Sequence, residues 1–188
     1  VLARQRVRYR GEAVAFIVAE SREQARDAAE AVEIDYQPLP AVSDGRATTA
    51  ADAPQIWDDA PDNVAFQFVL GDETGTADGI AKAARVVKLD VDNNRVILNA
   101  IETRAALGRY DGGRLILHST TQMPHRHKEQ IANHVFRVPP ESVQVLVGDV
   151  GGGFGGKNGL YVENCMVLFA ARELGLSLIH ISEPTRPC

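Results

Sequence analysis

The sequence has little cysteine and no long run of apolar residues. Its 188 residues include two cysteines, and Cys188 belongs to a terminal stretch of atypical sequence. If that stretch is set aside, Cys165 stands alone, which excludes a disulfide framework and suits a reducing cytoplasm. No apolar run approaches the ~18 residues that a membrane-spanning helix needs, so we expect no membrane span.

Basic residues are also sparse. Twenty Lys and Arg stand against 25 Asp and Glu, which gives a formal net charge of −5. This acidic balance, without a continuous Lys/Arg run, argues against nucleic acid as a partner. Because no initiator Met begins the sequence, we expect a piece of a longer protein. From the cysteine usage we expect a cytoplasmic location, with the periplasm left open because an export signal would lie upstream.

Glycine, by contrast, is concentrated in one run, Gly151-Gly152-Gly153-Phe154-Gly155-Gly156-Lys157. The alternating residues 143–147 predict a strand before it, and the apolar spacing over 161–174 predicts a helix after it. Backbone N–H groups at a helix start lack intrahelical partners and the helix dipole favours negative charge, so this junction is typical of an anion-binding loop.

Two kinds of anionic cofactor fit such a loop. Residues 151–157 formally satisfy the nucleotide-binding pattern G-x-x-x-x-G-K, but Asn158 stands where that pattern needs Ser or Thr to hold magnesium. This departure argues against a nucleotide hydrolase. The second kind is the pyrophosphate of a pterin cofactor.

The loop and several ordered segments resemble the large subunit of the molybdenum hydroxylases, the family of xanthine dehydrogenase, aldehyde oxidase and carbon monoxide dehydrogenase. The loop matches the family's G-G-G-F-G-G-K in full. Residues 8–40 look like the end of its α/β hammerhead domain. Ile101-Glu102-Thr103-Arg104-Ala105 is similar to the family's M-E-P-R-A, with Ile101 and Thr103 as departures, and residues 119–125 are similar to its S-T-Q-x-P-H.

The resemblance implies a set of site residues for molybdopterin, with its cytosine dinucleotide form as a variant. The implied cofactor-binding residues are Gln122, Gly152, Gly153, Phe154 and Gly155. Gln122 and the Phe154 amide would hydrogen-bond molybdenum oxygen ligands, and Phe154 and Asn158 would lie near the substrate. Alternatives for single residues are a plug role for Phe154 and a helix-capping role for Gln122. Lys157 would support the loop, neutralise cofactor charge or be solvated.

The function implied by the resemblance is an oxidoreductase that hydroxylates an aldehyde, an N-heterocycle or a related small molecule with water as the oxygen source. Electrons would pass to 2Fe-2S clusters and FAD on partner subunits, within a higher oligomer. Asn158 replaces the substrate-binding Glu of the purine hydroxylases, which argues against a xanthine-type substrate. The general-base Glu is expected downstream, so no catalytic residue is assigned and the piece alone is expected to be inactive. A P-loop-like nucleotide-binding protein and a non-catalytic degenerate homologue are the alternatives.

The expected fold class is α+β: the end of an α/β hammerhead domain over residues 1–42, a linker over 43–63, and the first part of a molybdopterin-binding domain over 64–175. Expected strands are 14–19, 33–36, 64–70, 86–91, 96–101, 105–110 and 115–119, with Asp111-Gly112-Gly113 as the hairpin turn between the last two. Ser21 and Gln24 form a capping box that predicts a helix after Ser21, and further helices are expected over 76–84 and 126–136. Residues 176–188 look like a translated sequencing adapter and are expected to be a non-native tail.

Other polar residues favour structural interpretations. Glu102 and Arg104 are expected to form a buried ion pair with each other. His125 and His127, two residues apart on a helix, would point to different faces, so a zinc site with His134 is not expected. Cys165 is expected to behave as a small hydrophobic residue on the apolar stripe of its helix.

Overall fold

The computed structural model describes residues 2–94 and 96–181. The described residues up to Glu33 and from Val96 onward form one compact unit, and those in between form a second. The predicted domain limits at residues 42, 63 and 175 stay predictions.

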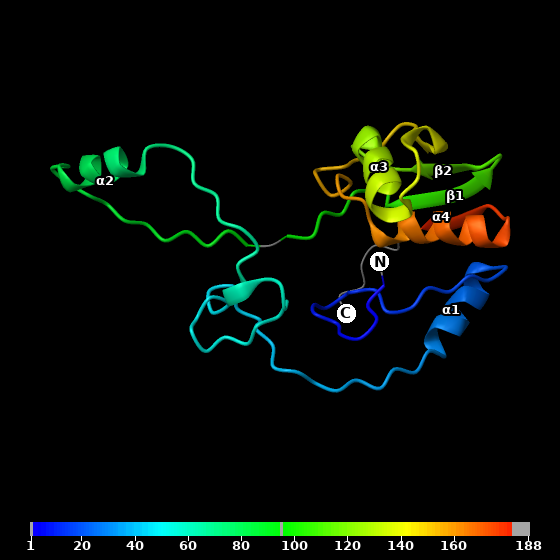
Figure 1. Ribbon diagram of the computed structural model, residues 1–188, viewed down its shortest axis with the longest axis horizontal. Coiled ribbons are helices and arrows are strands. Elements are labelled where there is room, and N and C mark those ends of the chain that lie inside the picture. The colour runs from blue at the N-terminus through cyan, green and yellow to red at the C-terminus, as the bar shows by residue number, and fades with distance from the viewer. Residues whose placement is uncertain (1, 95, 182–188) are drawn as a thin grey trace. The chain divides into compact units, whose positions relative to one another are not determined.

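A four-stranded mixed sheet is the centre of the first unit (Figure 1). Its strands are β1 (Ala105–Asp111), β2 (Arg114–Ser119), β3 (Val143–Leu146) and β4 (Leu178–Ile181), in the order β3-β2-β1-β4. β1 pairs antiparallel with β2 and with β4, whereas β2 and β3 are parallel. Gly112 and Gly113, both with positive φ, make the turn of the β1–β2 hairpin, as predicted.

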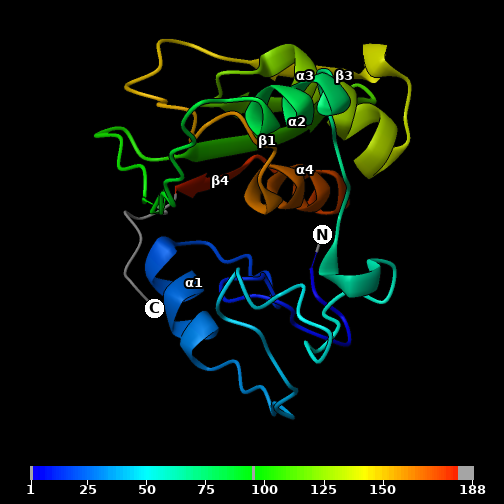
Figure 2. The ribbon, with the colours of Figure 1, turned by 90° about the vertical axis from the view of Figure 1, so that its left-hand side faces the viewer.

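Helices cover the two faces of this sheet (Figures 1 and 2). On one side lies α3 (Pro124–Gln130), which continues as a π-helical segment, η2 (Ile131–Phe136), and a 3-10 turn, η3 (Pro140–Ser142). On the other side lies α4 (Val162–Leu174). Gly108 of β1 lets this helix approach closely, because a Cβ there would lie 2.5 Å from the Val167 carbonyl carbon.

The core of the unit lies between these layers. Leu117, Ile131 and Leu168 are fully buried and come from β2, η2 and α4. Burial of side chains of this size stabilises a fold by ~1.5–3 kcal/mol each. The expected α+β class, with strands near 105–110, 115–119 and 143–147 and a helix near 161–174, is therefore confirmed.

The parallel pairing of β2 and β3 sets the position of the loops that follow them. Parallel strands end at the same edge of a sheet, and His118 of β2 is opposite Leu146 of β3 in the register. Residues 120–122 and the glycine-rich loop therefore leave the sheet side by side.

The N-terminal segment differs from the expected strand–helix–strand unit. The helix is present as α1 (Arg22–Glu30), with the predicted capping box between Ser21 and Gln24. The strands expected at 14–19 and 33–36 are wrong for the described chain, where both segments are irregular. Alternating apolar residues form a strand only when a neighbouring strand accepts and donates the hydrogen bonds.

The second unit contains η1 (Pro61–Asn63) and α2 (Glu73–Ala81). α2 begins three residues before the helix expected at 76–84, because the Asp72 carboxylate accepts the Gly75 N–H and caps it. Asn63 bridges Thr48, Pro54 and Ile56 around the turn that holds the half-exposed Trp57.

Three further expected strands are also wrong. Residues 64–70, 86–91 and 96–101 have no strand assignment and pair with no strand among the described residues. Conversely, β4 lies within the stretch that was expected to stand apart from the fold. The predicted non-native origin of residues 176–188 stays a prediction, and its part from 182 onward lies outside the described residues.

Candidate cofactor-binding site

The glycine-rich loop between β3 and α4 uses most of its backbone N–H groups within the protein. The acceptors are Glu102 Oε2 for Gly151 (2.7 Å), Val150 O for Gly152 (2.9 Å), Gly153 O for Gly156 (2.7 Å), Gln122 Oε1 for Lys157 (3.2 Å) and Gly155 O for Asn158 (3.4 Å). Within residues 2–94 and 96–181, the N–H groups of Gly153, Phe154 and Gly155 have no acceptor. Three consecutive donors are therefore left for a ligand.

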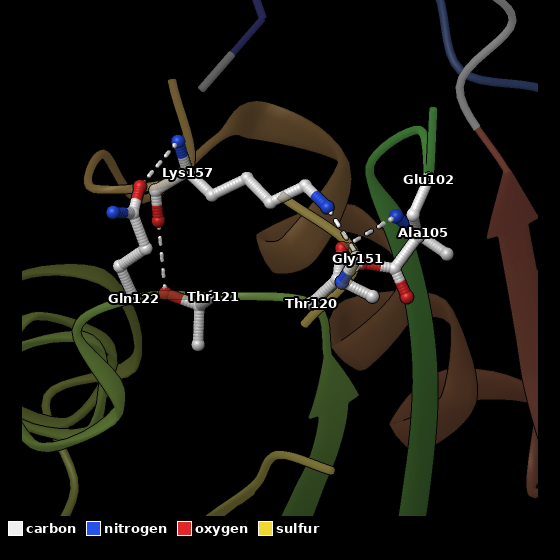
Figure 3. A network of polar contacts seen from close by, with 7 residues as sticks. All are labelled: Glu102, Ala105, Thr120, Thr121, Gln122, Gly151 and Lys157. Atoms are coloured by element: carbon white, nitrogen blue, oxygen red, sulfur yellow. Dashed lines mark hydrogen bonds and ion pairs between the residues drawn. The ribbon is translucent and has the colours of Figure 1, made fainter. Parts of the chain in front are cut away.

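Gln122 lies directly against this loop (Figure 3). Its backbone N–H donates to the Lys157 carbonyl (3.1 Å), and its Oε1 accepts the Lys157 N–H. A backbone N–H can only donate, so the oxygen of the amide must face it and the Nε2 group is left as a donor. A Cβ on Gly153 would lie 2.3 Å from Gln122 Cδ, so only glycine allows this contact.

Lys157 points into the protein. Its side chain is 3% exposed, and its Nζ lies 2.7 Å from Glu102 Oε2 (Figure 3). The Lys157 carbonyl also accepts the Thr121 hydroxyl (3.1 Å). Of the three roles considered for Lys157, the contacts are those of loop support.

Glu102 and Arg104 do not form the expected ion pair with each other. Arg104 Nε instead pairs with Glu163 Oε1 (3.0 Å), and its guanidinium lies 3.9 Å from the ring centroid of Tyr161. The hydrogen bond from Lys157, followed by that from the Gly151 N–H, holds the pKa of the Glu102 carboxyl below its ordinary value. The chain bends at Glu102, so the Glu102 carboxylate reaches the glycine-rich loop whereas the Arg104 guanidinium reaches Glu163 in α4.

His127 is a structural residue that the sequence analysis missed. It is 1% exposed, and its Nε2 lies 3.2 Å from the Asn158 carbonyl and 3.3 Å from Thr121 Oγ1. The Thr121 hydroxyl already donates to Lys157, so Nε2 carries the proton and donates. Burial lowers the pKa of this imidazole. The spacing of four from Ile131, a core residue, was the available signal that His127 lies on the buried side of its helix.

The remaining predicted site residues lie on or beside the loop. Phe154 has a φ of 48° and is 73% exposed, and Asn158 is also exposed. Gly155 has a φ of 82° with open space around its Cβ position. Gln122, Gly152, Gly153, Phe154 and Gly155 therefore form one cluster, while their contacts with a cofactor stay predictions.

The described residues contain no cluster of three His, Cys, Asp or Glu side chains that could hold a metal ion, and His125 and His134 are exposed. Cys165 is buried on α4, and this burial raises the pKa of its thiol to about 11, as suits a small hydrophobic residue. Residues 2–94 and 96–181 contain no helix with the length and apolar character to cross a bilayer.

Two parts of the chain match known protein families. Residues 56–181 match the family description "Molybdopterin cofactor-binding domain". Residues 1–40 match "Aldehyde oxidase and xanthine dehydrogenase, a/b hammerhead domain". The chain belongs to the molybdenum hydroxylase large-subunit family.

Individual molybdenum hydroxylases support this assignment. The chain is 34% identical over 94% of its length to the carbon monoxide dehydrogenase large chain of Afipia carboxidovorans, and 34% identical over 93% to the nicotine 6-hydroxylase large subunit of Paenarthrobacter nicotinovorans. It spans 23% and 21% of those two chains. The reconstituted CO dehydrogenase from Oligotropha carboxidovorans matches 97% of the chain, and 24% of that chain, with a TM-score of 0.88 at 32% identity.

The donors of the loop fit the cofactor of molybdenum hydroxylases. Three backbone N–H groups and the Gln122 amide are neutral donors in one cluster, and each suits an anionic oxygen. Lys157, the cation within the loop, is paired with Glu102, so its charge is compensated away from these donors.

Proposed function

We propose that this chain is part of a molybdopterin-dependent oxidoreductase that hydroxylates a small molecule with water as the oxygen source. Within it, Gln122 and the amides of Gly153, Phe154 and Gly155 bind the molybdenum end of the cofactor, with Gly152 giving the loop its shape. The bound cofactor would supply the two-electron redox chemistry. The chain's own residues orient it, and Phe154 and Asn158 border the substrate.

The observation that carries this proposal is the orientation of Gln122. Its oxygen is held by the Lys157 N–H, so its Nε2 donor is fixed beside a loop with three further unused donors. Preorganised neutral donors of this kind stabilise oxygen atoms that gain negative charge, because the donors are already in place and do not have to rearrange.

The same family membership supports the remaining parts of the proposal. We infer 2Fe-2S and FAD partner subunits as electron acceptors, a higher oligomer, and a cytoplasmic location. The cytosine dinucleotide form of molybdopterin is the variant to test first. For the substrate we favour an aldehyde, an N-heterocycle or carbon monoxide over a purine, because Asn158 offers an amide in place of a carboxylate.

The nucleotide-binding alternative has the geometry of Lys157 against it. In a P-loop the lysine ammonium reaches the phosphates, whereas Lys157 Nζ is buried on Glu102. Together with Asn158 in the position of the magnesium-binding hydroxyl, this contact leaves the loop without either of its phosphate-specific side chains.

The proposal is tested by measuring molybdenum and pterin per large subunit in the full-length complex, for the wild type and for Gly153→Ala. We expect about one molybdenum per wild-type chain and a loss of at least tenfold in the variant, because the added Cβ would displace Gln122. Gly79→Ala, where a Cβ meets open space, is the matched control and should load normally. A folded wild-type complex without molybdenum would support the non-catalytic homologue instead.

A further inference from the structure

We propose that Glu102 is a positioning residue that fixes the shape of the glycine-rich loop before any cofactor binds. The inference rests on the proposed function, because the loop it shapes is the one assigned to molybdopterin. Glu102 lies 49 residues before Gly151 and belongs to neither the loop nor its flanking elements.

One carboxylate oxygen of Glu102 holds both ends of the loop. Its Oε2 accepts the Gly151 N–H at 2.7 Å and the Lys157 ammonium at 2.7 Å (Figure 3). The Glu102 backbone N–H also donates to the Gly151 carbonyl (3.4 Å). Residues 151 and 157 begin and end the glycine run, so these contacts limit how far its ends can separate.

The composition of the loop explains why hydrogen bonds from Glu102 to both of its ends are needed. Five of the seven residues from 151 to 157 are glycine, which loses more conformational freedom on ordering than any other residue. Phe154, the large apolar side chain of the run, adds little packing because it is 73% exposed. Order in this segment therefore depends on hydrogen bonds, and Glu102 makes three of those at the Gly151 and Lys157 ends.

The charge of Lys157 explains why a carboxylate is needed at position 102. Lys157 is 3% exposed, and a buried ammonium without a counter-charge is strongly destabilising. Glu102 therefore permits Lys157 to be buried, and the buried Lys157 in turn presents its N–H to Gln122. Through this chain of contacts Glu102 influences the Gln122 amide, although the two side chains share no hydrogen bond among the described residues.

The experiment measures hydrogen exchange of the peptide that spans residues 148–159 in the full-length protein, after cofactor removal, together with molybdenum per chain before removal. The variants are Glu102→Gln, which keeps an acceptor for Gly151 but removes the charge, and Lys157→Met. Glu163→Gln is the matched control, because it removes the charge from the Arg104–Glu163 pair, which has a similar length and lies outside the loop.

We expect Glu102→Gln to raise exchange of the loop peptide about tenfold and to lower molybdenum content several-fold, while the β1–β2 peptide and Glu163→Gln match the wild type. The double variant Glu102→Gln/Lys157→Met should exchange more slowly than Glu102→Gln alone, since it leaves no buried unpaired ammonium. If only the number of contacts mattered, the double variant would exchange faster than Glu102→Gln, because it lacks more contacts.

Loop exchange that stays at the wild-type rate in both Glu102→Gln and Lys157→Met would overturn the inference, whatever the molybdenum content. Faster loop exchange in a protein whose wild type contains no molybdenum would support the role of Glu102 in the loop and overturn the proposed cofactor. If Glu102→Gln does not fold, the same comparison with Lys157→Met decides.

Discussion

The β1–β2 hairpin and the segments at 64–70 and 86–91 are similarly rich in apolar residues, but they differ in burial and in strand pairing. Leu115, Ile116 and Leu117 of the hairpin are at most 5% exposed, whereas Leu70 and Leu89 are 87% and 83% exposed. The hairpin has β3, β4 and two helical layers against it, while the other segments pair with no described strand. A run of apolar residues shows which side chains suit burial, and a partner strand decides whether a sheet forms.

Shortening one leucine in each region tests most directly whether the two regions differ in packing. Leu117→Ala should cost about 2–5 kcal/mol of unfolding free energy, because it leaves a cavity in a closed core. Leu89→Ala should change it by less than about 0.5 kcal/mol, since its side chain is exposed. Urea unfolding of both variants measures the difference. Equal losses would show that residues 86–91 are packed in solution.

The second prediction concerns how fast a thiol reacts in the native protein compared with the unfolded protein. For a buried thiol we expect these two rates to differ by about a hundredfold, which corresponds to about 2.7 kcal/mol. Cys165 is buried with a thiol pKa of about 11, so it should react with a maleimide at pH 7.5 at least about a hundredfold more slowly in the native protein than in urea. A cysteine placed at Leu89 should react equally fast in both. A Cys188→Ser background removes the other thiol, and rapid native labelling of Cys165 would contradict its burial.

Two glycine substitutions test the same difference, because they should change the free energy of unfolding in opposite directions. Gly108→Ala puts a methyl group against the Val167 backbone and should cost about 1–3 kcal/mol. Gly79→Ala meets open space within α2 and should stabilise this helix by about 0.5–1 kcal/mol. Thermal unfolding and circular dichroism measure the two effects. A neutral result at Gly108 would mean that α4 does not lie tightly on β1.

The smallest expected effect is a pH dependence confined to the packed region. Burial lowers the pKa of His127, so the unfolded chain binds its proton more readily, near pH 6.5, and stability is lost as the pH falls below that value. Exchange of the α3 peptide should therefore rise by a few-fold, relative to the intrinsic rate, from pH 7 to pH 5.5. His127→Gln should reduce this rise, and an unchanged rise would assign it to another group.

Local sequence signals predicted the parts of the fold that local contacts decide. The hairpin follows from its strand pattern and from Asp111-Gly112-Gly113, and α1 from its capping box. α4 follows from apolar spacing that ends at Gly175, which caps the helix with a positive φ. The cluster of Gln122 with the glycine-rich loop was predicted from the family resemblance rather than from these signals.

Other features depend on residues far apart in the sequence. The partners of Glu102 and Arg104 are 55 and 59 residues away, so adjacency in the sequence favoured the wrong pair. The role of His127 depends on a carbonyl 31 residues downstream. Ion pairs and buried hydrogen bonds follow from where elements pack, and a single sequence does not contain that information in a local pattern.

The parallel register of β2 and β3 has a consequence for how the site can change over time. Since the helical crossover of residues 124–142 returns the chain to the same sheet edge, Gln122 and the glycine run meet whatever the composition of the exposed crossover surface. Under the proposed function, substitutions at the exposed positions Phe154 and Asn158 are expected to alter which molecule is accepted while the framework stays intact. Selectivity and foldability would then be separable, which would make these positions a target for redesign.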